Sequence, residues 1–267
     1  MNRRRLTTPF LALAILVIAS LGCSVLSSPP ATSVPLEPQQ PLEPQQPQPT
    51  PVQPTPIQQE QPSPIPPTEA PSPTPENLKF FTEEFENGAA NWKPFVTSGK
   101  LAQLDFSARN GRLVFAISER QVWSYAVYTP QTYSNVMIEV QAENFGNNEN
   151  NVTLICRYSE RGWYEVTISN NGLYKIYFGK WDDNGTTASY AKIADGGSTN
   201  ILAGRAINTY AFSCKENVLT LIINGKEIKR VEERQRGLRE GQIGVGVSSF
   251  RYVPVEVEFD WVKITEP

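Results

Sequence analysis

Alternating apolar and polar residues constrain the fold of this chain more than any other sequence feature. Residues 136–143 read Val-Met-Ile-Glu-Val-Gln-Ala-Glu, and residues 164–169 read Tyr-Glu-Val-Thr-Ile-Ser. A period of two places successive side chains on opposite faces of an extended strand, so each segment is expected to bury one face. Residues 232–240 are charged and lack an apolar stripe, and no other segment has a helical period. The sequence therefore predicts an all-β protein.

Turn residues separate these segments. Asn224-Gly225 supplies the positive φ angles of a two-residue type I′ turn, which would place Leu221 opposite Ile228 in a hairpin. About a dozen short strands joined in this way predict a two-sheet antiparallel sandwich of the jelly-roll type. The other turn sequences are Asn-Asn-Gly at 170–172 and Asp-Asp-Asn-Gly at 182–185.

Residues 24–77 have a different composition. Most of the chain's 23 prolines lie here among Gln, Glu, Thr and Ser, and the hexapeptide Pro-Leu-Glu-Pro-Gln-Gln occurs twice in tandem over 35–46. Such a segment buries too little apolar surface to offset the entropy of ordering it, so we expect a disordered, extended linker that reaches on the order of 150 Å. A ligand for a proline-recognising domain is the alternative. The remaining residues, 78–267, are long enough for one domain with its own core.

The N-terminal 23 residues have the layout of an export signal. Three arginines at 3–5 precede an apolar run that is shorter than a membrane span, and small residues lead to Gly22-Cys23. The segment resembles a bacterial lipoprotein signal, although Ser20 stands where leucine is usual. The resemblance implies that Cys23 is lipidated and that the mature protein is extracytoplasmic and anchored to the cell membrane.

Composition excludes several classes of chemistry. The chain has no histidine, which removes Ser-His-Asp and Cys-His catalysis and histidine metal ligation. Acidic and basic residues are nearly balanced, so nothing favours nucleic acid as a partner. Two cysteines follow Cys23, and in an oxidising compartment Cys156 and Cys214 are expected to form a disulfide. Two buried free thiols are the alternative.

The order of the motifs in 78–267 resembles the concanavalin A-like lectin/glucanase superfamily, in particular its laminin-G-like and 3-keto-disaccharide hydrolase-like domains. The resemblance implies a jelly roll whose concave face often binds glycans and sometimes a calcium ion. It implies no activity by itself. The matching pieces are Phe81–Phe85 with Trp92, Ile155–Arg157, Gly162–Ile168, Leu219–Gly225, Gly241–Val247 and Val257–Ile264.

Three carboxylates near the C-terminus are the candidate catalytic residues. Glu256, Glu258 and Asp260 alternate along one predicted strand and so share a face, where two of them could act as the acid and nucleophile of a glycosidase. Glu258-Phe-Asp260 resembles the start of the glucanase motif Glu-x-Asp-x-x-Glu, but Lys263 replaces its last carboxylate. The alternative interpretation is the polar face of an ordinary strand.

Aromatic residues are the candidate binding residues. A sugar presents a flat apolar face that stacks on an aromatic ring, with hydroxyls at its edge for polar groups. Trp163 and Arg157 are out of phase with the core residues of their strands and are predicted on the outer face. Together with Trp123 and Tyr177 they form the predicted glycan platform, and a role in the core is the alternative.

Asp182 and Asp183 offer oxygen ligands of the kind that calcium takes, although the same residues form ordinary turns. No other cofactor is expected.

The sequence thus predicts a monomeric, non-catalytic domain on a lipid-anchored bacterial surface protein that binds an extracellular or cell-wall polysaccharide. Two alternatives stay open: a glycoside hydrolase-like enzyme, and an adhesive or structural module that binds protein.

Overall fold

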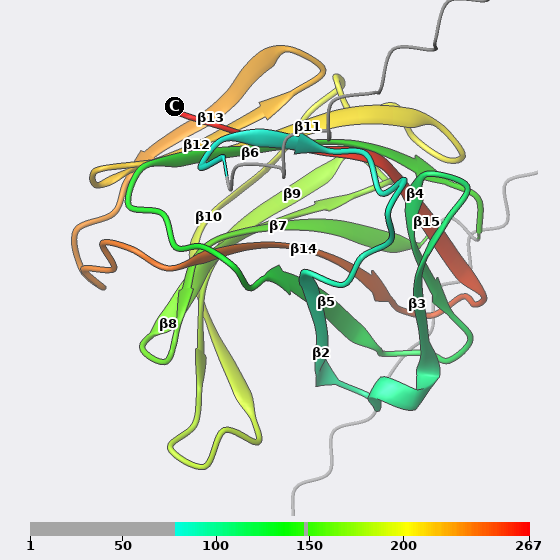
Figure 1. Cartoon of the computed structure of the whole chain (residues 1–267). Coiled ribbons are helices and arrows are strands. Elements are labelled where there is room, and N and C mark those ends of the chain that lie inside the picture. The colour runs from blue at the N-terminus through cyan, green and yellow to red at the C-terminus, as the bar shows by residue number, and fades with distance from the viewer. Residues whose placement is uncertain (1–77, 147–148) are drawn as a thin grey trace, which may run out of the picture. The chain divides into compact units, whose positions relative to one another are not determined.

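A computed structural model describes residues 78–146 and 149–267 (Figure 1). The predicted signal segment with Cys23 and the predicted linker lie outside the described residues. In the described part, fifteen strands form two antiparallel sheets, and a single turn of 3-10 helix at Leu101–Gln103 is the one helical element. None of the described residues belongs to a helix long and apolar enough to cross a membrane.

Sheet A has eight strands. Its order is β13 (Lys226–Glu232), β12 (Val218–Ile223), β11 (Ile207–Lys215), β6 (Val136–Asn144), β15 (Val255–Thr265), β4 (Arg112–Ile117) and β3 (Leu104–Arg109), with β1 (Phe81–Glu83) also paired to β15.

Sheet B has seven strands. Its order is β10 (Ala188–Gly197), β9 (Leu173–Trp181), β8 (Gly162–Ser169), β7 (Asn150–Ser159), β14 (Gln242–Ser249), β5 (Trp123–Tyr128) and β2 (Trp92–Ser98). Figure 1 shows the two sheets as stacked layers, and the prediction of a two-sheet jelly-roll sandwich is confirmed.

The core lies between the sheets and follows the predicted alternation. Val136, Ile138 and Val140 of β6 are fully buried, whereas the residues between them are partly exposed. On β8 the core residues are Tyr164, Val166 and Ile168. Burying one such side chain stabilises the folded state by on the order of 1.5–3 kcal/mol. The period of two thus gives β6 and β8, one strand of each sheet, an inner face toward the core and an outer face.

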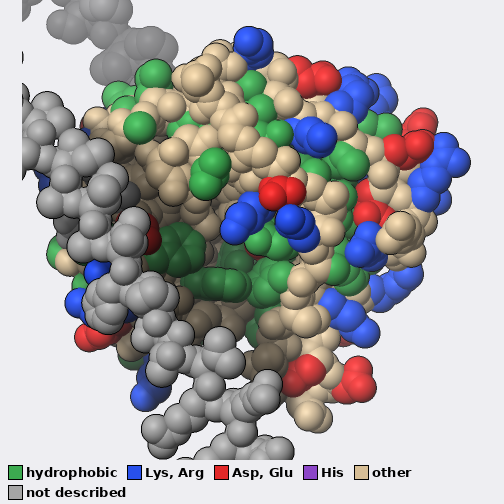
Figure 2. Space-filling model, turned by 180° about the vertical axis from the view of Figure 1, so that it is seen from behind, with side chains coloured by type: hydrophobic (Ala, Val, Ile, Leu, Met, Phe, Trp, Pro, Cys, Tyr) green, Lys and Arg blue, Asp and Glu red, His purple; other side chains and the backbone are tan. Residues whose placement is uncertain are grey.

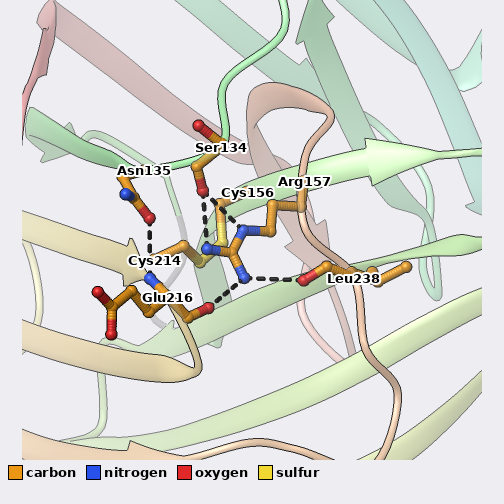
Figure 3. Close-up of a disulfide and its surroundings, with 7 residues drawn as sticks. All are labelled: Ser134, Asn135, Cys156, Arg157, Cys214, Glu216 and Leu238. Atoms are coloured by element: carbon orange, nitrogen blue, oxygen red, sulfur yellow. Dashed lines mark hydrogen bonds between the residues drawn. A yellow bond between two sulfur atoms is a disulfide. The ribbon is translucent and has the colours of Figure 1, made fainter.

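A disulfide joins the two sheets. Cys156 on β7 and Cys214 on β11 are 58 residues apart in sequence, and their Cα atoms are 6.5 Å apart (Figure 3). Both cysteines face the core, which is where strands of opposite sheets can be bridged.

The register of the β12–β13 hairpin differs from the prediction. Asn224-Gly225 forms the expected turn with positive φ at both residues. However, Leu221 pairs with Lys229, because the register shifts between Leu221 and Ile222. A β-bulge adds one residue to a strand, so the predicted pairing with Ile228 is displaced by one position.

Candidate functional site

The outer face of sheet B carries an aromatic cluster that is separate from the core. Its buried members are Tyr125, Ile155 and Trp163. An outer face is normally polar, because water covers it. The further members packed against these three are Phe95, Trp123, Tyr158, Trp181, Ala188 and Tyr190.

Local sequence explains how this cluster packs. Trp163 on β8 pairs with Gly179 on β9, and a Cβ atom at Gly179 would lie 2.3 Å from the Trp163 indole. The glycine therefore leaves the space that the indole fills. The Phe95 ring stacks on Tyr125, with ring centroids 5.1 Å apart and planes 16° apart.

Beside this cluster the face is hollowed. The hollow has a volume of about 360 Å³. Figure 2 shows hydrophobic side chains recessed in a hollow on one face of the molecule, with charged side chains of both signs beside it. The residues that line the hollow are Trp123, Tyr125, Asn151, Glu165, Thr167, Ser169, Lys175, Tyr177, Tyr190, Ser248 and Phe250.

Tyr190 on the edge strand β10 is central to the aromatic wall. Its ring lies edge-on to Trp123, with centroids 5.4 Å apart, and edge-on to Tyr177, with centroids 5.9 Å apart. Its hydroxyl donates to Thr97 Oγ1 at 2.7 Å and lies 3.1 Å from the Tyr125 hydroxyl. Burial raises the pKa of the Tyr190 phenol, so it stays protonated and available as a donor at neutral pH.

Glu165 on β8 is the one carboxyl group among the residues that line the hollow, and it is 1% exposed. Its Oε2 accepts a 2.7 Å hydrogen bond from the Trp163 indole. Burial raises the pKa of Glu165 to about 7, and hydrogen bonds with Trp163 and Tyr125 oppose part of that shift. A carboxyl with such a pKa changes its charge near neutral pH, and groups of this kind concentrate at functional sites.

Two buried polar atoms near the hollow lack a hydrogen-bond partner among the described residues: the Trp123 indole nitrogen and the Thr153 hydroxyl. Thr153 pairs with Thr167 on β8 and with Gly246 on β14, so it belongs to the same face. Buried polar atoms are nearly always hydrogen-bonded in folded proteins. A ligand or bound water would supply the missing partners.

The structure brings two of the four predicted platform residues to the hollow. Trp123 and Tyr177 line it. Trp163 lies on the predicted face but is fully buried within the aromatic cluster, so its ring face is covered by its neighbours.

Arg157 does not lie on this face, which corrects the prediction from alternation. Its backbone has φ +56°, and the pairing of β7 with β8 shifts register between Cys156 and Ser159. This bulge interrupts the alternation, and the next residue, Tyr158, packs in the outer cluster instead. The Arg157 guanidinium donates to the carbonyl oxygens of Ser134, Glu216 and Leu238 beside the disulfide (Figure 3).

The three predicted catalytic carboxylates lie on the other sheet. Glu258 and Asp260 on β15 contact the Arg112 guanidinium, at 3.1 and 3.4 Å, and Glu143 of β6 contacts it at 2.8 Å. Glu256 pairs with Ala116 on the same sheet. None of the three lines the aromatic hollow. The arrangement is an ion cluster around one arginine, with the carboxylates partly exposed to solvent.

Asp182 and Asp183 lie in the turn between β9 and β10. The Asp182 carboxylate accepts hydrogen bonds from the Thr186 backbone at 2.7 Å and from the Thr186 hydroxyl at 3.0 Å, which are the bonds of a turn. Within residues 78–146 and 149–267, no three or more Cys, Asp or Glu side chains come together as a metal site.

Sequence reasoning missed the polar residues of the hollow. Glu165 is two positions from Trp163 on one strand, so a shared face was predictable from the period of two. The same holds for Lys175, which is two positions from Tyr177 on β9. Tyr190 gave no such signal, because it reaches the hollow only through the pairing of β10 with β9 and of β9 with β8.

Comparisons with known proteins identify the fold. No family model and no curated protein matches the sequence. A Bacillus subtilis protein of unknown function with a galectin-like fold is 8% identical, with a TM-score of 0.51 over 70% of this chain and 94% of that chain. The GH16 protein of a Bacteroides ovatus mixed-linkage glucan locus, in complex with its G4G4G3G product, is 13% identical, with a TM-score of 0.50 over 69% and 99%. A β-1,3-1,4-glucanase from a mouse hindgut metagenome is 12% identical, with a TM-score of 0.50 over 71% and 100%.

Proposed function

We propose that the hollow on the outer face of sheet B is a carbohydrate-binding site and that the protein binds an extracellular or cell-wall polysaccharide without cleaving it. The observation that carries this proposal is an aromatic-lined hollow on a sheet face that would otherwise be polar. Trp123, Tyr177 and Tyr190 offer ring surface for the apolar face of a sugar. Asn151, Thr167 and the other polar lining residues offer hydrogen bonds to its hydroxyls.

The fold supports this proposal. Two of the similar structures are glucan-active proteins, and one of them was solved with an oligosaccharide product bound. The likeness is one of fold alone, since the identities are 12 and 13%. The case for this chain therefore depends on its own aromatic residues.

The N-terminal sequence adds a location to the proposal. A lipidated Cys23 would hold the protein at the outer side of the cell membrane, and the proline-rich residues 24–77 would let the domain reach polymers at a distance. Cys23→Ser should release the protein from the membrane fraction. A protein that still partitions with membranes would contradict lipidation.

A glycan array with the purified protein tests the binding function. The affinity for the glycans that bind should fall about tenfold or more in Trp123→Ala and in Tyr177→Ala, because each change removes a stacking surface. Trp261→Ala is the matched control, since Trp261 is a partly exposed tryptophan of β15 on the other sheet. A broad array without any hit would overturn the proposal.

Glycoside hydrolysis is the second candidate, and Glu165 is the observation that favours it. A buried carboxyl with a pKa of about 7 suits a general acid. However, hydrolysis in most glycosidases uses two carboxyl groups, and Glu165 is the one carboxyl among the residues that line the hollow. The test is hydrolysis of an oligosaccharide by the purified protein. Hydrolysis that is lost in Glu165→Gln and retained in Glu258→Gln would establish this second function.

A further inference from the structure

A chain of hydrogen bonds connects Glu165 to the wall of the hollow. Glu165 interacts with the Tyr125 side chain, the Tyr125 and Tyr190 hydroxyl oxygens are 3.1 Å apart, and the Tyr190 hydroxyl donates to Thr97. The chain thereby joins strands β8, β5, β10 and β2 of one sheet. Glu165, Tyr125 and Tyr190 of this chain all line the hollow.

Counting hydrogens shows how the charge on Glu165 acts on this chain. A tyrosine hydroxyl has one hydrogen to donate. Tyr190 donates its hydrogen to Thr97, so with a neutral Glu165 the hydrogen between Tyr125 and Tyr190 comes from Tyr125. An ionised Glu165 competes for that hydrogen, because the hydrogen bond with Tyr125 favours the charged carboxylate and lowers the pKa of Glu165. The charge on Glu165 therefore determines whether Tyr125 donates to Tyr190 or to Glu165.

The surroundings of Glu165 contain no cation that pairs with it. The titratable and charged groups on this side of sheet B are Lys93 of β2, Tyr125 of β5, Tyr158 of β7, Tyr177 and Lys175 of β9, and Tyr190, Lys192 and Asp195 of β10. Lys192 pairs with Asp195 at 3.2 Å. Within the described residues no salt bridge involves Lys175 or Glu165, so Lys175 is the cation of the hollow without a carboxylate partner.

Glu165 is 1% exposed whereas Lys175 is exposed, so Lys175 is the charged group of the lining that a ligand can reach. We propose that the ligand of the hollow is an anionic saccharide, a polymer whose sugar rings bear carboxylate or sulfate groups, and that Lys175 is the residue that selects it. This inference rests on the proposed carbohydrate-binding function. The aromatic wall receives the ring, and the Lys175 ammonium group pairs with the acidic substituent. Glu165 acts as a positioning residue, because its hydroxyl partners Tyr125 and Tyr190 form that wall.

The charge on Glu165 should make the affinity for an anionic saccharide depend on pH. Ionisation near pH 7 places a negative charge beneath the bound anion and takes the Tyr125 hydrogen away from Tyr190. Affinity for an anionic saccharide is therefore highest below pH 7 and falls as the pH rises through it. Glu165→Gln, which stays neutral, should lose most of this pH dependence.

The experiment uses the full chain and three probes of equal length: polygalacturonate oligosaccharides, sulfated dextran oligosaccharides and neutral mixed-linkage β-glucan oligosaccharides. Affinities are measured at pH 6 and pH 8 and at low and high salt. We expect binding of one or both acidic probes, weakened about fivefold by Lys175→Gln and by high salt. Lys180→Gln is the matched control, because Lys180 is an exposed lysine of the same strand that does not line the hollow.

Each outcome decides one claim. The two acidic probes distinguish carboxylate from sulfate as the recognised group. Preference for the neutral probe, or equal effects of Lys175→Gln and Lys180→Gln, overturns the anionic-ligand inference and leaves the binding function standing. An absence of binding to all three probes and to a broad glycan array overturns the binding function itself and the inference with it.

Discussion

The Trp163 indole nitrogen donates a 2.7 Å hydrogen bond to the Glu165 carboxyl, two residues along the same strand of sheet B. Both side chains lie on the outer face of the sandwich, yet both are buried. Aromatic residues from β2, β5, β9 and β10 cover this pair. The pair thus places an ionisable group at the edge of an apolar cluster, beside a hollow large enough for a sugar ring.

Gly179→Ala should disrupt this arrangement. The added Cβ atom would meet the Trp163 indole at 2.3 Å, so the indole must move and its bond to Glu165 must break. We expect a loss of about 1–3 kcal/mol in the free energy of unfolding, measured by urea denaturation, together with a shift in tryptophan fluorescence. Gly197→Ala on β10 is the control, because its Cβ atom would find only ordinary contacts beginning at 3.4 Å. Equal stability of the two variants would contradict this packing.

Glu165 should make stability depend on pH. Its pKa rises from an ordinary value of 4.5 to about 7 in the folded protein. Between those values the unfolded chain loses the proton and the folded chain keeps it, so stability falls as the pH rises from about 4.5 to 7 and is then level. The free energy of unfolding falls by up to about 3 kcal/mol over this range because of Glu165. Measuring the free energy of unfolding against pH for the native sequence and for Glu165→Gln isolates this term as the difference between the two curves. Two parallel curves would refute the raised pKa.

Loss of the disulfide should destabilise the sandwich without altering the hollow. Cys156 and Cys214 close a loop across 58 residues between the two sheets, for which chain entropy predicts about 4 kcal/mol. The double variant Cys156→Ala with Cys214→Ala should therefore unfold at lower urea concentration, as should the native sequence after reduction. Unchanged unfolding midpoints in both samples would show that the bond contributes nothing.

Arg157 should be needed for stability and not for binding. Its guanidinium is buried and donates to three backbone carbonyl groups, which Arg157→Met would leave without donors. We expect a loss of about 3 kcal/mol by urea denaturation and unchanged glycan affinity in the folded fraction. Arg161→Met, at an exposed position in the next turn, is the control. A selective loss of affinity in Arg157→Met would restore the prediction that it contacts the ligand.

The sequence by itself determined the all-β class, the antiparallel sandwich and the face on which most side chains lie, because a period of two is a local property of extended backbone. It also singled out Trp123 and Tyr177 as aromatic candidates, and both line the hollow.

Only the tertiary structure decided which residues form the hollow. A bulge at Arg157 interrupted the alternation on β7, and strand order placed Glu256, Glu258 and Asp260 on sheet A, away from the aromatic face. Glu165 is buried because Tyr125 and Tyr190, far away in the sequence, pack over it from other strands. Local alternation assigns a side chain to a face, but the burial, charge and partners of that side chain depend on the strands that pair beside it.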